Sequence, residues 1–164
     1  MIWFGLLVIA LISFSGVLLV GAPYLPTLSD QQTTAFKLMN LKKGDTLIEL
    51  GCGDGKVVVA AARQGINVVG YELNPLLFMV SYLRTWRYRA QVRIVWGNFW
   101  TAELPKAQAV YVFLLPKYME KLNDFCESYQ PKPLKLVSIA FEIKSKKPAQ
   151  TSNGVFFYKY GGKS

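Results

Sequence analysis

The amino-acid sequence contains no histidine among its 164 residues. Imidazole-based acid–base catalysis, a Ser-His-Asp triad and a zinc site with histidine ligands are therefore excluded. Cysteine is scarce, since only Cys52 and Cys126 occur, and their wide separation matches neither a metal-binding nor a disulfide pattern. The composition also lacks the signature of a disordered chain, because 52% of the residues are hydrophobic and 18% are charged. The length favours one domain with a single core.

Charge is missing from the beginning of the chain, where no Lys, Arg, Asp or Glu precedes Asp30. Residues 2–22 form an apolar run that, at about 1.5 Å per helical residue, is long enough to cross a bilayer. We therefore expect a transmembrane anchor over residues 1–22 and a globular domain over residues 23–164. A cleaved signal peptide and a buried core helix remain alternatives, although the basic n-region and small-residue cleavage site of a signal are missing.

The charged residues that do occur give a net charge of +9. Lys37, Lys42 and Lys43 follow the apolar run, so the positive-inside tendency predicts a single-pass membrane protein with its domain on the cytoplasmic side, or the organelle equivalent. The densest basic stretch, residues 84–93, is interleaved with Trp86 and Tyr88. Such a stretch can bind a nucleic-acid strand, face solvent at a helix end, or meet anionic lipid headgroups.

Short apolar runs that fit buried strands alternate with helical patterns along the rest of the chain. Strands are expected at residues 45–50, 67–71, 91–96, 107–114, 134–141 and 155–160. Helices are expected at residues 29–40, 56–63, 74–88 and 117–129. Asn74 and Pro75 have the residue types preferred at the N-cap and first position of a helix. The alternation predicts an α/β fold with a doubly wound, mostly parallel sheet of Rossmann-like type, whose last strand adds antiparallel after a polar loop.

The strongest local signal is ELGCGDG at residues 49–55, which follows an expected strand and precedes an expected helix. Glycines in this setting let a ligand approach the backbone, and Glu72, at the exposed tip of the next strand, can accept both hydroxyls of a ribose. A Walker loop would need a hydroxyl after Lys56, and a dinucleotide fingerprint would need glycine in place of Lys56. A ligand with one ribose and no phosphate, such as S-adenosylmethionine, fits best. A glycine turn without any ligand is the alternative.

These motifs, ELGCGDG and GYELNP followed by Trp86-Arg87, resemble those of class I S-adenosylmethionine-dependent methyltransferases. They are most similar to the small membrane-anchored lysine methyltransferases that modify the ADP/ATP translocase and the ATP synthase c-subunit. Members of that family also carry an apolar N-terminal segment, a stretch like PYLP at residues 23–26, and a stretch like VFLLP at residues 112–116. The resemblance extends from residue 1 to about residue 141, with the motifs in the same order.

The resemblance implies S-adenosyl-L-methionine as cofactor and no metal. The residues that it assigns to cofactor binding are Glu49, Gly51, Cys52, Gly53, Asp54, Gly55, Glu72, Leu73, Asn74, Asn98 and Phe99. Among them, Glu72 would hold the ribose hydroxyls, and Leu73 and Asn74 would lie beside the adenine. Asn98 occupies a position where family members often have an acidic residue, and a purely structural role in a turn is equally compatible with it.

The stretch after the fourth strand indicates the methyl acceptor. It lacks the Asn/Asp-Pro-Pro-Tyr/Phe pattern of enzymes that methylate exocyclic amines of bases or glutamine. The resemblance therefore implies direct, in-line methyl transfer to a lysine side chain of a membrane protein. Candidates for lining the lysine channel are Tyr24, Leu115, Pro116 and Tyr118, whose alternative role is packing, and no catalytic base can be named. A membrane-tethered RNA or small-molecule methyltransferase and a non-enzymatic adaptor are the alternatives.

Overall fold

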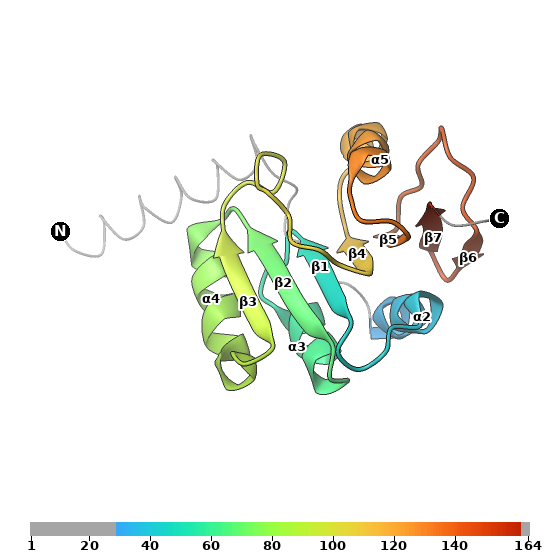
Figure 1. The fold of residues 1–164 in the computed structure, drawn as a ribbon. Coiled ribbons are helices and arrows are strands. Elements are labelled where there is room, and N and C mark those ends of the chain that lie inside the picture. The colour runs from blue at the N-terminus through green and yellow to red at the C-terminus, as the bar shows by residue number, and fades with distance from the viewer. Residues whose placement is uncertain (1–28, 162–164) are drawn as a thin grey trace.

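A computed structural model describes residues 29–161, which form a seven-stranded sheet with helices on both faces (Figure 1). The strands are β1 (Thr46–Leu50), β2 (Asn67–Glu72), β3 (Val92–Trp96), β4 (Ala109–Val112), β5 (Leu134–Ile139), β6 (Gln150–Ser152) and β7 (Val155–Tyr160). Their order across the sheet is β3-β2-β1-β4-β5-β7-β6. Strands β1 to β5 pair in parallel, and β7 pairs antiparallel with both β5 and β6. The expected doubly wound, mostly parallel sheet with an antiparallel last strand is confirmed.

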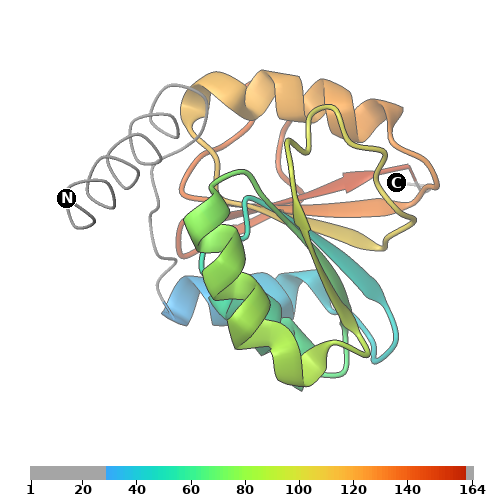
Figure 2. The ribbon, with the colours of Figure 1, turned by 90° about the vertical axis from the view of Figure 1, so that its left-hand side faces the viewer.

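The helices form two layers around this sheet. They are α2 (Ser29–Met39), α3 (Lys56–Arg63), α4 (Pro75–Thr85) and α5 (Met119–Ser128), with short 3-10 helices η1 (Trp86–Tyr88) and η2 (Pro116–Tyr118). Figure 2 shows α5 along one face of the sheet and α2, α3 and α4 along the other. Buried side chains alternate between two cores, so that Ile48 of β1 packs on the α5 side and its neighbour Leu47 packs on the α2 and α3 side.

The start of α4 is set by local sequence, as expected. The Asn74 side-chain oxygen accepts the backbone N–H groups of Leu76 at 2.9 Å and Leu77 at 3.3 Å. Pro75 occupies the first helical position, where its missing N–H breaks no helical hydrogen bond. The N-cap therefore fixes α4 directly after β2.

Several expected boundaries are wrong by a few residues. The fourth strand ends at Val112 instead of residue 114, and the fifth ends at Ile139 because Ala140 adopts a left-handed φ of 67°. The polar loop expected before the last strand contains β6. It pairs with β7 through a tight turn at Asn153 and Gly154, whose φ values are 51° and 70°. A turn with two positive φ values matches the right-handed twist of a hairpin, so the loop folds back as one.

The expected anchor over residues 1–22 lies outside the described residues. Within residues 29–161, no helix combines the length and the apolar character that crossing a bilayer requires.

Candidate functional site

The glycine motif lies at the carboxyl end of β1, in the middle of the sheet. Strand β1 pairs with β2 on one side and with β4 on the other, so the order of strands reverses at this point. Ligands of open α/β sheets bind outside the carboxyl ends of the strands where the order reverses. The topology therefore places residues 51–55 where a ligand site is expected.

The loop between β1 and α3 needs its glycines for two different reasons. Gly51, Gly53 and Gly55 have φ values of 80°, 54° and 79°, a region that side chains disfavour. A Cβ atom on Gly51 would meet nothing within 4 Å, whereas one on Gly55 would lie 3.0 Å from the Cβ atom of Ser81 in α4. Among the described residues, Gly51 is thus needed for its backbone conformation and not to avoid a clash, whereas Gly55 also permits the close approach of the loop to α4.

Glu72, at the end of β2, holds this loop in place. Its Oε2 atom accepts the backbone N–H of Gly53, and its Oε1 atom accepts the backbone N–H of Asn74, both at 2.8 Å. The expectation of an exposed carboxylate is wrong, because Glu72 is only 8% exposed. Each carboxylate oxygen has a second lone pair, so Glu72 can still accept ribose hydroxyls while it anchors the loop.

Glu49 is the second buried carboxylate, one residue before the end of β1. It is 5% exposed, and its Oε2 atom has no hydrogen-bond partner among the described residues. Burial raises the pKa of Glu49 well above its usual range, and the nearby charges of Asp54 and Glu72 raise this pKa further. A buried polar atom without a partner is costly, and a cationic ligand group would relieve both the missing bond and the crowding of negative charge.

Asp54 lies in the same loop but points to the helices. Its carboxylate forms ion pairs with Lys56 at 3.3 Å and with Arg84 of α4, whose guanidinium also donates to the Asp54 backbone oxygen at 2.9 Å. Its predicted role in cradling a ligand is untested. The contacts show that Asp54 ties the loop to α3 and α4.

Two further predicted residues are engaged in structure. The Cys52 side chain is buried in the core, and its backbone N–H donates to the Tyr71 backbone oxygen at 2.8 Å. Its side chain therefore contributes packing. Asn74 uses its side-chain oxygen to cap α4. Leu73, between Glu72 and Asn74, is 36% exposed at the end of β2. Of these three residues, Leu73 offers the most accessible side chain.

Asn98 is a turn residue after β3. Its side-chain oxygen accepts the backbone N–H of Trp100 at 3.0 Å, and its backbone oxygen accepts the N–H of Thr101 at 3.2 Å. The structural alternative for Asn98 is therefore present in the fold. Whether its amide also contacts a ligand stays a prediction, and Phe99 beside it is half-buried.

An aromatic cluster, not anticipated from the sequence, lies over the loops that follow β3 and β4. The Trp100 ring lies 4.7 Å from Phe99, 6.1 Å from Tyr118 and 5.9 Å from Phe125 between centroids. The predicted channel residue Tyr118 thus belongs to this cluster, next to half-buried Leu115 and exposed Pro116, whereas Tyr24 lies outside the described residues. The cluster was not anticipated because Trp100 and Phe125 belong to no recognisable motif. The helical spacing of Phe125 indicated only that it packs against the sheet.

The carboxyl end of the sheet therefore combines a glycine loop, two buried carboxylates and an aromatic cluster. Glu49 can receive a cation, and Glu72 has spare acceptor capacity toward hydroxyls. The exposed glycine backbone at Gly51 leaves room for a ligand. These features fit a ligand that has both a cationic group and a ribose.

Comparisons with known proteins find similar sequences. A family model described as the ANTKMT methyltransferase domain matches residues 49–150. The lysine N-methyltransferase of the ATP synthase c-subunit from Xenopus laevis is 33% identical over 103 residues, which are 62% of this chain and 45% of that protein. The adenine nucleotide translocase lysine N-methyltransferase of Mus musculus is 30% identical over 129 residues, or 77% of this chain and 56% of that protein. The chain spans about half the length of these curated relatives.

The fold also matches solved structures. The crystal structure of an RNA methyltransferase from Salinibacter ruber in complex with S-adenosyl-L-homocysteine superposes with a TM-score of 0.79 at 24% sequence identity. The match covers 85% of this chain and 96% of that one. At this identity the likeness concerns the fold.

Proposed function

This chain belongs to the ANTKMT methyltransferase domain family, and on that premise we propose that it is an S-adenosylmethionine-dependent methyltransferase whose acceptor is a lysine side chain of a membrane protein. The observation that carries the proposal is the unpartnered, buried Oε2 atom of Glu49 beside the glycine loop. A carboxylate kept at this cost in a ligand site needs a cationic partner, and S-adenosylmethionine has an ammonium group and a sulfonium.

Each part of the site suits one part of this cofactor. Glu49 would receive the ammonium group, Glu72 the ribose hydroxyls, and the backbone of residues 51–55 would lie against the cofactor. Leu73 would contact the adenine from the end of β2, where it is exposed. The bound cofactor supplies an electrophilic methyl group, and the protein's contribution is to hold and orient it.

The acceptor lysine has to lose its proton before it can attack. Its amine has a reference pKa of about 10.4, and an apolar surrounding lowers this pKa because it disfavours the charged form. The aromatic cluster of Phe99, Trp100, Tyr118 and Phe125 provides such a surrounding beside the predicted channel residues Leu115 and Pro116. Desolvation and positioning then suffice for direct in-line displacement, without histidine or a covalent intermediate.

The membrane setting is part of the proposal. Residues 1–22 would anchor the chain, with the methyltransferase domain of residues 23–164 on the cytoplasmic side or its organelle equivalent. The names of the relatives, which are lysine methyltransferases of the ATP synthase c-subunit and of adenine nucleotide translocase, support a membrane-protein acceptor.

The test is incubation of the full chain with detergent-solubilised membranes and radiolabelled S-adenosylmethionine, followed by identification of the labelled band and of methyl-lysine after hydrolysis. Glu49→Gln should lose the labelling, while a matched change at exposed Glu142, Glu142→Gln, should keep it. Label that appears in RNA or in a small molecule, and not in lysine, would contradict the proposed acceptor. It would favour the alternative that the basic stretch of residues 84–93 suggests.

A further inference from the structure

Helix α4 exposes four apolar residues and buries its small polar ones. Leu76, Met79, Val80 and Leu83 are between 43% and 66% exposed, and their spacing places them on one face of the helix. On the buried side, Ser81 and Thr85 are at most 3% exposed, and their hydroxyls donate to backbone oxygens of α4 itself. We call the four exposed residues the α4 apolar face. A contiguous apolar face of this kind usually marks a contact surface.

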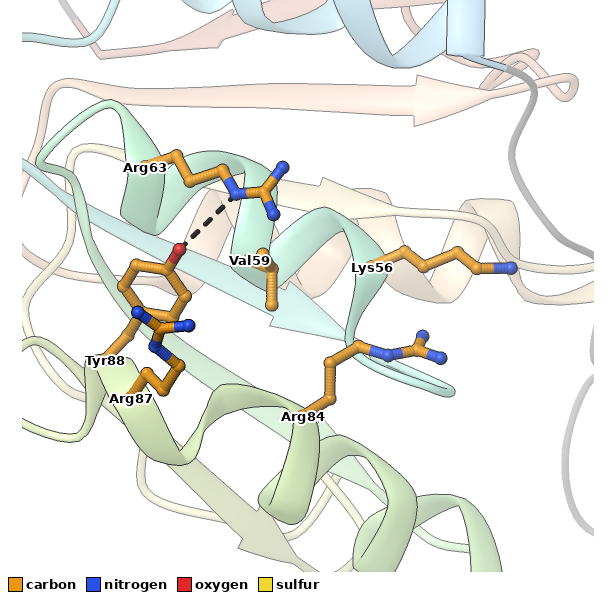
Figure 3. Close-up of a pocket in the computed structure, with 6 residues that line it drawn as sticks. All are labelled: Lys56, Val59, Arg63, Arg84, Arg87 and Tyr88. Carbon is orange, nitrogen blue, oxygen red and sulfur yellow. Dashed lines mark hydrogen bonds between the residues drawn. The ribbon is translucent and has the colours of Figure 1, made fainter.

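One flank of this face is a basic groove between α3 and α4 (Figure 3). The groove has a volume of about 380 Å³ and is lined by Lys56, Val59, Arg63, Arg84, Arg87 and Tyr88. Asp54 pairs with Lys56 and Arg84, and the Arg63 Nε atom donates to the Tyr88 hydroxyl at 3.4 Å. With four cations and one carboxylate, the groove has a net positive charge suited to phosphate groups.

The opposite flank is aromatic. Tyr82, Trp86 and Trp96 are 41%, 49% and 62% exposed, and the Tyr82 and Trp86 rings lie 5.6 Å apart in an edge-on arrangement. The guanidinium of Arg89 lies 5.0 Å from the Trp86 ring. Tryptophan and tyrosine are the side chains that proteins place at the level of lipid headgroups.

We propose that α4 docks on an anionic lipid surface, with its apolar face among the upper acyl chains and the basic groove on the headgroup phosphates. Apolar side chains flanked by arginine and tryptophan are the composition of a helix that lies in the membrane interface. Helix α4 itself contains no acidic residue that would oppose an anionic surface. A second copy of the chain that paired its α4 antiparallel to this one would bring two positively charged grooves together, which disfavours that occupant.

Docking on α4 orients the whole site. Asn74 caps α4 immediately after Glu72, so the N-terminal end of the helix lies at the carboxyl end of the sheet, where the glycine loop is. A domain held by α4 therefore presents this edge close to the bilayer. If the proposed lysine acceptor is correct, this orientation serves it, but the docking itself rests on the surface of α4 and its two flanks.

The experiment uses the full chain reconstituted in lipid vesicles, with a polarity-sensitive fluorophore on a cysteine introduced by Leu83→Cys. Native Cys52 and Cys126 are buried, so the label goes to the new thiol. The matched control is Ser152→Cys, which is exposed in β6 at the far end of the sheet from α4 (Figure 1). In vesicles with anionic phospholipid, nitroxide-bearing lipids should quench the label at position 83 severalfold more than the label at position 152.

The charge requirement is tested in the same assay. The pair Arg63→Gln and Arg87→Gln, and vesicles made of uncharged lipid alone, should each reduce the quenching at position 83 severalfold. The control pair Lys144→Gln and Lys147→Gln removes two exposed cations elsewhere and should leave it unchanged. Quenching at position 83 that equals position 152, or that ignores the Arg63 and Arg87 pair, overturns the proposal. If the emission of the label at position 83 is blue-shifted but the nitroxide-bearing lipids do not quench it, a protein covers the α4 apolar face. That result also overturns the proposal. None of these readouts depends on methyl transfer, so docking and the proposed function can fail separately.

Discussion

Glu49 couples the stability of the fold to pH. Burial raises the pKa of its carboxyl in the folded state, so between the unfolded and the folded pKa the folded protein holds a proton that the unfolded chain has lost. The free energy of unfolding therefore falls as pH rises through that window, by about 1.4 kcal/mol per unit of raised pKa. We predict that Glu49→Gln flattens this slope and makes the protein more stable at neutral pH, as measured by denaturant unfolding across pH. An unchanged slope would mean that Glu49 is solvated.

The same substitution should weaken the binding of S-adenosylmethionine. The cationic cofactor favours the ionised carboxylate, so binding by the unmodified chain should release part of a proton at a pH within that window. Calorimetry in buffers with different ionisation enthalpies measures this release, and Glu49→Gln should abolish it while Glu142→Gln preserves it.

Glu72 is both a predicted ligand group and a structural one. We predict that Glu72→Ala abolishes cofactor binding and also costs roughly 2–4 kcal/mol of stability, because the buried N–H groups of Gly53 and Asn74 lose their acceptors. Glu72→Gln retains one acceptor oxygen and should fold more stably than Glu72→Ala. Calorimetric titration below the unfolding temperature decides the binding role. Unchanged affinity in folded Glu72→Ala would remove Glu72 from the site.

Local sequence predicted the single-residue roles that depend only on neighbouring residues. The Asn74 cap is one example, because its partners lie two and three positions away. The double anchoring by Glu72 and the ion pair of Asp54 with Arg84 could not be predicted in this way. Both depend on how closely the glycine loop, β2 and α4 approach each other in space.

Between elements, the contact of the glycine loop with α4 depends on Gly55. Alanine there would have a disfavoured φ of 79° and a Cβ atom 3.0 Å from Ser81, so we predict that Gly55→Ala costs about 1–3 kcal/mol and weakens cofactor binding. Gly97→Ala is the matched control, since its Cβ would meet nothing within 4 Å. Thermal unfolding compares the two, and equal losses would contradict the close approach. Adding Ser81→Gly to Gly55→Ala removes the clashing Cβ atom. It should restore the stability lost to this clash but not the stability lost to the disfavoured φ.

The elements themselves were predictable where apolar periodicity is strong, as for β1 and α3. The hairpin of β6 and β7 was missed because β6 is short and fully exposed, so no alternation of apolar residues shows it. Its one sequence signal is the Asn153-Gly154 pair, which is typical of a tight hairpin turn.

For the whole molecule, the fold and the family expected from the motifs are confirmed by the sheet order and by the family match.

The membrane anchor over residues 1–22 remains a prediction. We expect that deleting residues 1–20 leaves the affinity for S-adenosylmethionine nearly unchanged but sharply reduces methylation of the membrane-embedded target. Tethering raises the effective concentration of the active site near that target, and the deletion removes this gain. Comparison of both chains in native membranes measures it, and equal rates would show that the segment is dispensable.

The position of β7 inside the sheet has a consequence for folding on the ribosome. Strand β7 lies between β5 and β6, and its Tyr158 and Tyr160 are at most 1% exposed in the core against α5. A nascent chain that has emerged only as far as β5 can pair its five parallel strands but leaves the edge of β5 open. Because domains form as synthesis proceeds, this edge stays available to other chains until β7 emerges. We therefore expect chaperones to protect the growing polypeptide during the interval between the two strands.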